Sequence, residues 1–556
     1  MTGPDDLGRG PASIDPPTPC GSGAVEEAEA IWRALAALGV RDVVLAPGSR
    51  SAPFVYALQD ATVAAALRPH VRVDERAAAF TALGISRANP ASPGVVVTTS
   101  GTATAHLHAA VLEAHHAGVP LIVLTADRPA ELRDTGANQA TRQAGLYGDA
   151  VRYAFDLPAP AAGGAAAVEL RTAVNAVARA FAAATGEDPG PVHLNVCLRD
   201  PLTPVAASLD AAPAGGPIVL TRRPAQPAPE PVEIRVTGRT VVVAGDGAGP
   251  AARAFAEEHR LPLFAEPSSD ARGGDALIGG YPELLREVMT AGAGALRPDR
   301  AVVFGHPTLS RPVVTGLLGA PDVDVVVVHP GPRWPDAARR AGLVVPAAAG
   351  VATPAAAQGQ RAFLAAWRAA ASAAPGPASW QARAAVTAWD ACGPDDVLVL
   401  GSSSVVRDLE QHAGAARATV VANRGLAGID GLVSTATGVA LARAGRPGRV
   451  RALIGDLTAV HDLTGLVIGP DEPAVGLDVV VLDDGGGRIF SGLEHRAAPP
   501  AVLRRFFTTP HGVDLVAAGR ALGVPAAAVT PGGLAAALAA PATGRRLLVV
   551  REGSAG

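Results

Sequence analysis

The sequence predicts an α/β protein with three doubly wound parallel-sheet domains. Its 556 residues are too many for one hydrophobic core, because single cores stop growing at about 250–300 residues. Short apolar segments rich in valine recur along the chain, and glycine or polar residues bound each of them. Such segments are typical of parallel strands whose two faces are both covered by helices.

The composition describes a globular protein without signs of nucleic-acid or membrane binding. The chain is 49% hydrophobic with a net charge of −4, and it contains no basic tract. No segment is apolar over the length of a membrane span, and residues 1–22 lack the apolar core of a signal peptide. We therefore expect a cytoplasmic protein with a disordered tail at residues 1–22.

The usage of lysine and cysteine excludes several kinds of chemistry. All 47 basic residues are arginine, which excludes Schiff-base chemistry on a lysine and a Walker lysine. Cys20, Cys197 and Cys392 lie far apart in the sequence without paired spacing, so we expect reduced thiols.

Residues 23–205 are predicted to form the first domain. Residues 26–38 have helical spacing that ends at Gly39, and a strand follows at residues 43–45. The loop after this strand, PGSRS at residues 47–51, can offer backbone N–H groups and a guanidinium to an anion. For this loop alone, an ordinary turn is the alternative.

Three other strand ends of this domain carry polar side chains. The chain changes from strand to helix at Asp74-Glu75-Arg76, which by itself is most simply a helix cap. A strand that begins at Val95 ends in Ser100-Gly101-Thr102, and a strand that begins at Leu121 ends in Asp127-Arg128-Pro129. For Asp127 and Arg128, a local ion pair is the alternative.

Residues 206–232 are rich in Pro, Ala and Gly and are predicted to be a linker to a central domain at residues 233–350. In that domain, a strand at residues 240–244 leads into a glycine-rich turn at residues 245–249, the pattern of a Rossmann dinucleotide fingerprint. Glu266 follows at about the spacing of that fingerprint's acidic residue. Further strands are predicted at residues 302–304 and 324–328.

Residues 351–380 are predicted to be a linker region around a short helix, and residues 381–556 the third domain. Two of its strands end in carboxylates and glycines, Gly455-Asp456 and Asp483-Asp484-Gly485-Gly486-Gly487. Because ligands bind beyond the carboxyl ends of parallel strands, the two clusters would meet at one edge. Hard oxygen ligands beside glycine suit Mg²⁺ and a diphosphate. Other strands are expected at residues 397–400, 420–422 and 547–550.

The spacing of these clusters resembles the thiamine-diphosphate motif, in which Gly-Asp is followed at a fixed distance by Asn. Here an aspartate stands in place of the asparagine. Counting forward from Asp456 favours Asp483, whereas counting back from Gly486-Gly487-Arg488-Ile489-Phe490 favours Asp484. Both remain candidates, and an ordinary turn at a strand end is the alternative for the motif alone.

Longer strings resemble one family of thiamine-diphosphate enzymes, the MenD family of 2-succinyl-5-enolpyruvyl-6-hydroxy-3-cyclohexene-1-carboxylate synthases. The matching strings are PGSRS at 47–51, DERAAAFTALGISR at 74–87, TADRPAEL at 125–132, GANQA at 136–140, SSVVR at 403–407 and NRGLAGIDG at 423–431. The resemblance implies pyrimidine-binding, central Rossmann-like and diphosphate-binding domains of the thiamine-diphosphate enzyme type. Central domains of related enzymes are often empty, and we favour that interpretation here.

The resemblance also implies roles for individual residues. Glu75 would contact N1′ of the thiamine aminopyrimidine. The implied catalytic residues are Glu75, Gln139, Arg50, Arg128, Ser403, Arg407 and Arg424. Arg311 is a further candidate for substrate binding. The implied cofactor residues are Ser49, Glu75, Ser100, Gly101, Thr102, Ile429, Gly455, Asp456, Leu457, Gly486, Ile489 and Phe490. Mg²⁺ or Mn²⁺ would be bound by Asp456, by Asp483 or Asp484, and by Gly486.

The activity implied is that of a transferase of menaquinone biosynthesis. It decarboxylates 2-oxoglutarate and adds the succinyl carbanion in a 1,4 sense to isochorismate. The two substrates bring four carboxylates, which suits an arginine-rich site. In this superfamily, different subunits hold the pyrimidine and the diphosphate, so we expect a homodimer or homotetramer.

Two other functions deserve comparison. An acetolactate synthase or a 2-oxoacid decarboxylase acts on substrates with fewer carboxylates and would not need the arginines of PGSRS, ADRP and NRG. A cofactor-binding scaffold without turnover is favoured only by the aspartate at the metal motif, and aspartate is still a good Mg²⁺ ligand.

Overall fold

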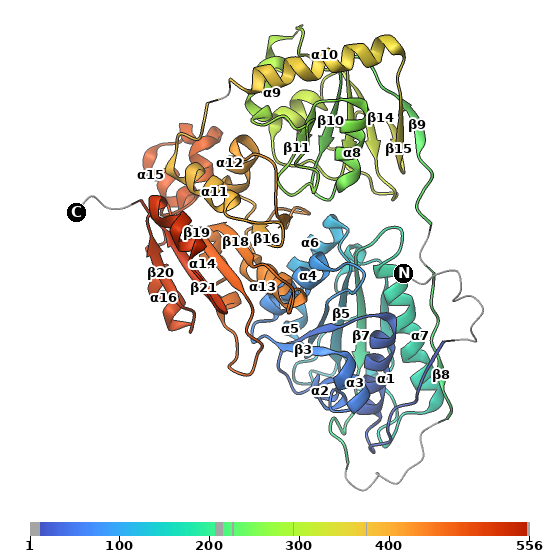
Figure 1. The fold of residues 1–556 in the computed structure, drawn as a ribbon. Helices are drawn as coiled ribbons and strands as arrows, with labels where there is room; N and C mark the ends of the chain where they lie inside the picture. The colour runs from blue at the N-terminus through green and yellow to red at the C-terminus, as the bar shows by residue number, and fades with distance from the viewer. Residues whose placement is uncertain (1–11, 206–214, 225–226, 293, 374, 553–556) are drawn as a thin grey trace. The chain divides into compact units, whose positions relative to one another are not determined.

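The computed structural model describes residues 12–205, 215–224, 227–292, 294–373 and 375–552 (Figure 1). The chain falls into two compact units. The first contains Met1–Pro227, Val433–Ala444 and Asp462–Val475, and the second contains Ala228–Leu432, Gly445–His461 and Gly476–Gly556. Among the helices of the described residues, none combines the length and the hydropathy that a membrane span requires.

The first unit is built on a six-stranded parallel sheet, which confirms the predicted α/β class. Its strands lie in the order β3-β2-β4-β5-β7-β6. Their bounds are β2 (Asp42–Leu45), β3 (Arg68–Val71), β4 (Val95–Thr98), β5 (Leu121–Asp127), β6 (Ala154–Leu157) and β7 (Pro191–Cys197). Every strand pair in this sheet is parallel.

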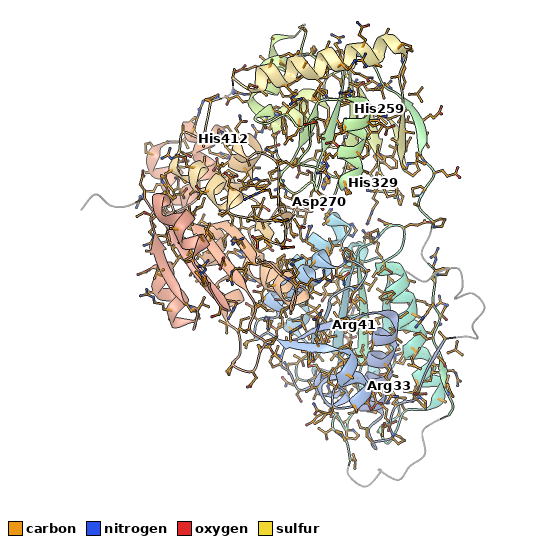
Figure 2. All side chains as sticks on the ribbon, in the orientation of Figure 1. Arg33, Arg41, His259, Asp270, His329 and His412 are labelled. Carbon is orange, nitrogen blue, oxygen red and sulfur yellow. The ribbon has the colours of Figure 1, made fainter. Side chains whose placement is uncertain are left out.

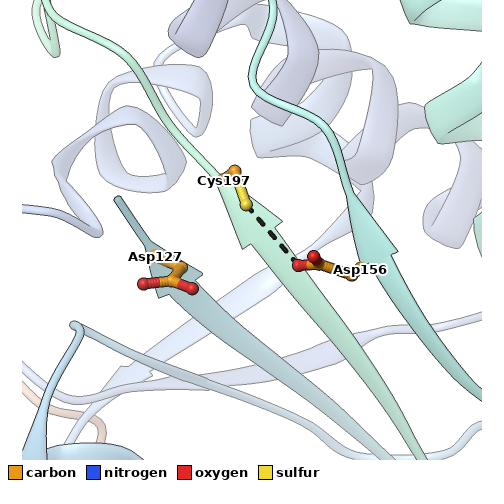
Figure 3. Close-up of side chains that lie close together, drawn as sticks. All are labelled: Asp127, Asp156 and Cys197. Atoms are coloured by element: carbon orange, nitrogen blue, oxygen red, sulfur yellow. Dashed lines mark hydrogen bonds between the residues drawn. The ribbon is translucent and has the colours of Figure 1, made fainter. Parts of the chain in front are cut away.

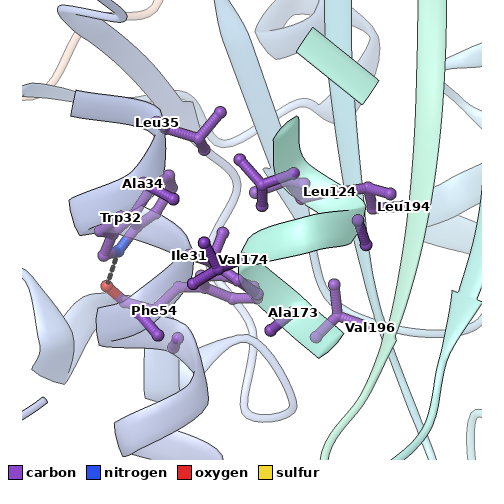
Figure 4. Close-up of a cluster of buried hydrophobic side chains, with 14 of the residues drawn as sticks. Ile31, Trp32, Ala34, Leu35, Phe54, Leu124, Ala173, Val174, Leu194 and Val196 are labelled. Atoms are coloured by element: carbon purple, nitrogen blue, oxygen red, sulfur yellow. Dashed lines mark hydrogen bonds between the residues drawn. The ribbon is translucent and has the colours of Figure 1, made fainter. Parts of the chain in front are cut away.

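Alternate residues of these strands enter two different cores, as expected when helices cover both faces. On one face, α1 (Gly23–Leu38) and α7 (Ala167–Ala184) pack against side chains such as Leu124 and Leu194 (Figure 4). On the other face, α4 (Glu75–Ala88) and α6 (His108–Ala117) pack against Val44 and Val96. The remaining helices of the unit are α2 (Ala52–Ala57), α3 (Ala61–Ala66), α5 (Thr102–Ala105) and most of α13 (Leu432–Ala442).

Local signals explain where α1 begins and ends. The Ser22 side chain accepts a hydrogen bond from the N–H of Val25, and Gly39 ends the helix with φ of 106°. Arg33 of this helix, labelled in Figure 2, pairs with the buried Glu29 at 2.7 Å and with Asp60 at 3.1 Å.

The N-terminal segment corrects the predicted disordered tail. Residues 1–11 lie outside the described residues, but β1 (Ser13–Ile14) pairs antiparallel with β8 (Ile218–Val219). Ile14 and Ile218 are both buried in the core below α1, which explains the order of these two short segments. The predicted linker at 206–232 therefore contains a strand.

The second unit contains two parallel sheets. The five-stranded sheet has the order β11-β10-β12-β13-β14, and the six-stranded sheet has the order β17-β16-β18-β19-β21-β20. The first consists of β10 (Thr240–Ala244), β11 (Leu263–Ala265), β12 (Arg300–Phe304), β13 (Asp324–Val328) and β14 (Ala341–Val345). The second consists of β16 (Val397–Leu400), β17 (Thr419–Ala422), β18 (Val450–Gly455), β19 (Leu477–Leu482), β20 (Ala526–Val529) and β21 (Arg545–Val550).

Helices surround both sheets of this unit. Those beside the five-stranded sheet are α8 (Pro250–His259), α9 (Tyr281–Ala291) and α10 (Pro354–Ala371). The others are α11 (Trp380–Asp390), α12 (Ser404–His412), α14 (Asp456–His461), α15 (Pro500–Val502), α16 (Leu515–Ala521) and α17 (Leu534–Ala539). A two-stranded parallel pair, β9 (Val232–Arg235) with β15 (Ala348–Val351), completes the unit.

The region 351–380 is not the linker that the sequence predicts. Its helix α10 buries Phe363 and Trp367 in the core of the five-stranded sheet, where Trp367 contacts Phe264 with ring centroids 4.9 Å apart. The sequence predicts only a short helix here, whereas α10 extends over Pro354–Ala371 and its two aromatic residues supply the buried face.

Candidate functional site

In the first unit, two predicted loops meet at the carboxyl ends of β2 and β4. Gly48 of the PGSRS loop lies so close to Thr99 that a Cβ atom on Gly48 would be 2.2 Å from the Thr99 Cβ. Only glycine allows this approach. Gly101, with φ of 84°, then turns the chain into α5. The structure thus brings Ser49 and Arg50 to the same sheet edge as Ser100, Gly101 and Thr102.

Arg128 lies at this edge with few charge partners. It is buried, and its Nη1 donates to Ser100 Oγ at 2.5 Å and to the carbonyl oxygen of Gln139 at 3.0 Å. Burial, and next the nearby Arg50 guanidinium, lower the pKa of Arg128. Arg50 donates to the Leu198 carbonyl at 2.9 Å and contacts Asp200 at 3.4 Å. Two guanidinium groups that repel each other define a place for an anion.

Gln139 and Glu75 are accessible from solvent in this unit. The Gln139 backbone has φ of 53° and packs against Gly101, while its side chain is exposed. Glu75 is the first residue of α4 and is half-buried. Its neighbour Asp74 caps the helix and accepts hydrogen bonds from the N–H groups of Arg76 and Ala77. Asp74 is therefore a helix cap, the simplest interpretation that the sequence offered for this segment.

The acidic cluster Asp127, Asp156 and Cys197 offers ligand atoms within 4.8 Å of one another (Figure 3). The Arg133 guanidinium already supplies the positive charge that a metal ion would bring to this cluster. Its guanidinium lies 3.0 Å from Asp127, 2.7 Å from Asp156 and 2.7 Å from the Cys197 sulfur. Burial, and next Asp156, raise the pKa of the Cys197 thiol, so it stays protonated. We interpret this cluster as an ion-pair network that fixes the ends of β5 and β7.

In the second unit, the two predicted carboxylate clusters meet at the ends of β18 and β19. Asp456 Oδ1 accepts a hydrogen bond from the N–H of Leu457, and Oδ2 accepts one from the N–H of Gly486, both at 2.7 Å. Gly486 has φ of 147°, and a Cβ atom there would lie 2.3 Å from the Thr508 carbonyl oxygen. The glycine therefore lets the loop approach both Asp456 and Thr508.

Asp483 and Asp484 point to different surroundings. The ligand atoms of Asp483, Asp456 and His511 lie within 4.8 Å of one another. Asp484 instead contacts Arg488 at 3.3 Å and accepts a hydrogen bond from Gln381 at 3.4 Å. The ligand atoms of Asp483 are thus grouped with those of Asp456, while the Asp456 carboxylate also acts on Asp484 and, next after burial, raises its pKa.

His511 is a member of this cluster that the sequence did not reveal. Its Nδ1 accepts a hydrogen bond from the N–H of Val513 at 3.0 Å, so the neutral ring carries its proton on Nε2. That atom lies 3.4 Å from Asp456 Oδ2. This nitrogen is buried and has no hydrogen-bond partner among the described residues. His511 lies in a loop before α16. The sequence did not reveal it because the predicted site residues were sought at the ends of strands.

The charges of the cluster fit a cation. Burial, and next the Asp483 carboxylate, raise the pKa of Asp456. Burial, and next Asp456, raise the pKa of Asp484 to about 6. Arg551, which follows β21 beside β19, holds Asp483 Oδ2 at 2.6 Å. Carboxylate oxygens that repel one another beside a glycine backbone suit Mg²⁺, which takes oxygen ligands.

Arg407 and Arg424 form a second pair of mutually repelling guanidinium groups. Burial, and next Arg424, lower the pKa of Arg407. Arg407 donates to the carbonyl oxygen of Ser403 at 2.9 Å, and Arg424 donates to Thr308 Oγ1 at 2.5 Å. Arg424 is 2% exposed, and its Nε and Nη1 have no hydrogen-bond partner among the described residues.

The other predicted residues of this unit differ in their surroundings. A Cβ atom on Gly455 would be 3.7 Å from Ser403 Oγ. Phe490 contacts Phe507 with ring centroids 5.7 Å apart, Ile489 is half-buried, and Ile429 is 36% exposed. Arg311 is exposed and pairs with Glu494 at 3.3 Å.

The glycine-rich turn of the central domain packs against protein. A Cβ atom on Gly245 would be 2.1 Å from the Pro307 nitrogen. Glu266 is buried, and its Oε1 accepts hydrogen bonds from the N–H groups of Thr308 at 2.7 Å and Leu309 at 2.9 Å. A dinucleotide fingerprint needs its acidic residue to bind the ribose, and here Glu266 already binds the protein backbone.

Comparisons with known proteins agree with this geometry. Residues 26–146 match the family model described as "Thiamine pyrophosphate enzyme, N-terminal TPP binding domain". The chain is 46% identical to the 2-succinyl-5-enolpyruvyl-6-hydroxy-3-cyclohexene-1-carboxylate synthase of Kineococcus radiotolerans, over 88% of each chain. It is 43% identical to the synthase of the same name from Arthrobacter sp., over 96% of this chain and 90% of the relative. It is 42% identical to that of Mycobacterium avium, over 92% and 94%.

Proposed function

Because the chain belongs to the family of thiamine-diphosphate-dependent 2-succinyl-5-enolpyruvyl-6-hydroxy-3-cyclohexene-1-carboxylate synthases, we propose that it joins 2-oxoglutarate to isochorismate with loss of CO2. The product is the compound in the family's name, an intermediate of menaquinone biosynthesis. The observation that carries this proposal is the presence of two arginine pairs, Arg50 with Arg128 and Arg407 with Arg424. Within each pair, the two guanidinium charges repel each other, and a substrate carboxylate bound between them would relieve that repulsion.

The residues of the second unit are suited to hold the cofactor's diphosphate through a metal ion. Asp456 and Asp483 would supply carboxylate oxygens to Mg²⁺ or Mn²⁺, and Gly486 its backbone carbonyl. The N–H groups of Leu457 and Gly486 fix the orientation of Asp456. Ser403, Gly455 and Ile429 are proposed to contact the cofactor or the substrate.

Thiamine diphosphate, when bound, would supply the nucleophilic carbon that no side chain of this protein offers. Glu75 would hold the pyrimidine ring of the cofactor and supply the carboxylate for its proton transfer. Arg50, Arg128, Arg407 and Arg424 orient the substrate carboxylates, and Gln139 lies beside the reacting groups. These guanidinium groups stabilise negative charge during the reaction.

The decisive experiment is incubation of the purified protein with Mg²⁺, thiamine diphosphate, 2-oxoglutarate and isochorismate. We expect isochorismate to disappear and CO2 to be released in equal amounts. CO2 release that is unaffected by isochorismate would indicate a simple 2-oxoacid decarboxylase. Absence of both changes would contradict the proposal. Gel filtration of the same sample tests the proposed homodimer or homotetramer.

A further inference from the structure

Six polar side chains, of which Arg407 is half-buried and the others are buried, form a cluster in the second unit where α9 contacts α12. Three are arginines, two are glutamates and one is a tyrosine: Glu266, Arg272, Tyr281, Arg407, Glu410 and Arg424. Glu266 follows β11, Tyr281 begins α9, and α12 carries Arg407 and Glu410. The cluster therefore connects the central domain to the two arginines that we assign to the substrate.

Of the two glutamates, Glu266 has too few hydrogen-bond donors for a negative charge. Glu410 Oε1 accepts a hydrogen bond from the Tyr281 hydroxyl at 2.5 Å, and the Ser310 hydroxyl beside it also opposes the rise that burial causes in the pKa of Glu410. Glu266 Oε1 accepts two backbone N–H groups, but its Oε2 is buried without a partner among the described residues. An ionised oxygen in that position costs free energy, and two neighbouring buried carboxylates resist simultaneous ionisation. Burial, and next Glu410, raise the pKa of Glu266 to about 8.

Arg272 has a structural role that uses most of its donors. It donates to the carbonyl oxygens of Ala265, Ala413, Glu410, Leu409 and Gly414. This arginine binds the central sheet to α12, and the Glu410 carboxylate lies near both Arg272 and Arg407. Arg407 and Arg424 then remain as two positive charges that no side-chain carboxylate contacts in an ion pair among the described residues.

We propose that Glu266 and Glu410 hold one proton between them and thereby preserve the two positive charges of Arg407 and Arg424 for a dicarboxylate 2-oxo acid. The inference rests on the proposed function, which assigns these arginines to the substrate. Glu266 is a positioning residue: it contacts the backbone of Thr308, and the Thr308 hydroxyl holds Arg424. The central domain would thus determine the preference for a substrate with two carboxylates.

Loss of the shared proton should weaken substrate binding. Above pH 8 a second negative charge appears beside Arg407 and Arg424 and competes with the substrate for them. Tyr281 donates to Glu410 at any pH below its own raised pKa, and Arg272 stays charged, so neither offsets this change. The KM for 2-oxoglutarate should therefore rise while kcat changes less. A monocarboxylate 2-oxo acid, which needs only one guanidinium, should show a smaller rise.

The test compares the wild type with Glu266→Gln, using enzyme loaded with Mg²⁺ and thiamine diphosphate. For the wild type we expect the KM for 2-oxoglutarate to rise roughly fivefold between pH 8 and pH 9, as for a single ionisation with a pKa of about 8. Glutamine cannot ionise, so the rise should disappear in the variant, and KM at pH 7 should stay near normal. Glu283→Gln, which changes an exposed glutamate of α9, should behave like the wild type. An alkaline rise of equal size in Glu266→Gln would overturn the proposal.

Infrared spectroscopy gives a readout that needs no turnover. The wild type should show the band of a protonated carboxyl group at pH 7 that titrates near pH 8, and Glu266→Gln should lack it. If Glu266→Gln does not fold, the same measurement on Glu410→Gln and the pH titration of the wild type test the inference. A wild type without the titrating band would contradict it. An inactive wild type that keeps the band would instead contradict the proposed function. In that case, calorimetry with 2-oxoglutarate at pH 7 and pH 9 still tests the charge requirement.

Discussion

At the scale of single residues, Glu75 and Asp74 can be distinguished by experiment. Glu75→Gln keeps the size of the side chain but cannot move a proton in the same way. We expect it to bind thiamine diphosphate and to slow exchange of the cofactor's C2 proton strongly, with decarboxylation falling in parallel. Asp74→Asn is the matched control, because Asp74 caps α4. It should cost about 1 kcal/mol of stability and leave exchange intact. Normal exchange in Glu75→Gln, measured by NMR, would assign the proton to another residue.

The metal centre yields a second prediction for single residues. Asp483 lies with Asp456, whereas Arg488 and Gln381 hold Asp484. We therefore expect Asp483→Ala and Asp456→Ala to abolish Mg²⁺-dependent binding of thiamine diphosphate, and Asp484→Ala to reduce it less. Calorimetry of cofactor binding at fixed Mg²⁺ measures this order. Equal losses for Asp483→Ala and Asp484→Ala would mean that both aspartates support the metal.

The sequence could predict those residues whose roles follow from their position in a strand-end motif. Asp456, Gly486 and Arg128 occupy such positions, and the structure finds each of them at a sheet edge. His511 and Glu410 could not be predicted in this way. Each depends on long-range packing of a loop or helix against a strand end, and no local pattern records that contact.

At the scale of elements, α10 provides a test of domain organisation. Trp367 of this helix is 0% exposed and packs against Phe264 and Phe363 in the core of the five-stranded sheet. Trp367→Ala should therefore destabilise the protein by about 3–5 kcal/mol. Trp334→Ala, which removes a tryptophan that is 47% exposed, is the control and should cost much less. Denaturant unfolding followed by circular dichroism measures both. A small cost for Trp367→Ala would restore the linker interpretation.

Strands of valine were the elements most readily predicted. The residues of β10, β13 and β16 form strands with the expected bounds, because a short β-branched segment between glycines has few other stable conformations. Elements that depend on a distant partner were missed. β1 and β8 have two residues each and form only because they pair with each other over the core of the first unit.

At the scale of the whole molecule, the predicted site residues divide between the two compact units. The residues proposed for the pyrimidine, Glu75 among them, belong to the first unit, and those proposed for the diphosphate, Asp456 among them, belong to the second. In the thiamine-diphosphate superfamily, the two groups of a single site come from different subunits. If this holds here, each active site of a homodimer combines Glu75 of one subunit with Asp456 of the other.

This arrangement predicts that two inactive variants restore activity when their subunits mix. Glu75→Gln and Asp456→Ala each damage every site of their own dimer. A mixed dimer contains one site with both defects and one site with neither. After unfolding and refolding of an equimolar mixture, half of the dimers should be mixed, and activity should return to about a quarter of the wild-type value. Mixing without refolding is the control and should restore activity only as fast as subunits exchange. If refolded mixtures stay inactive while gel filtration shows dimers, each site draws both residues from one chain.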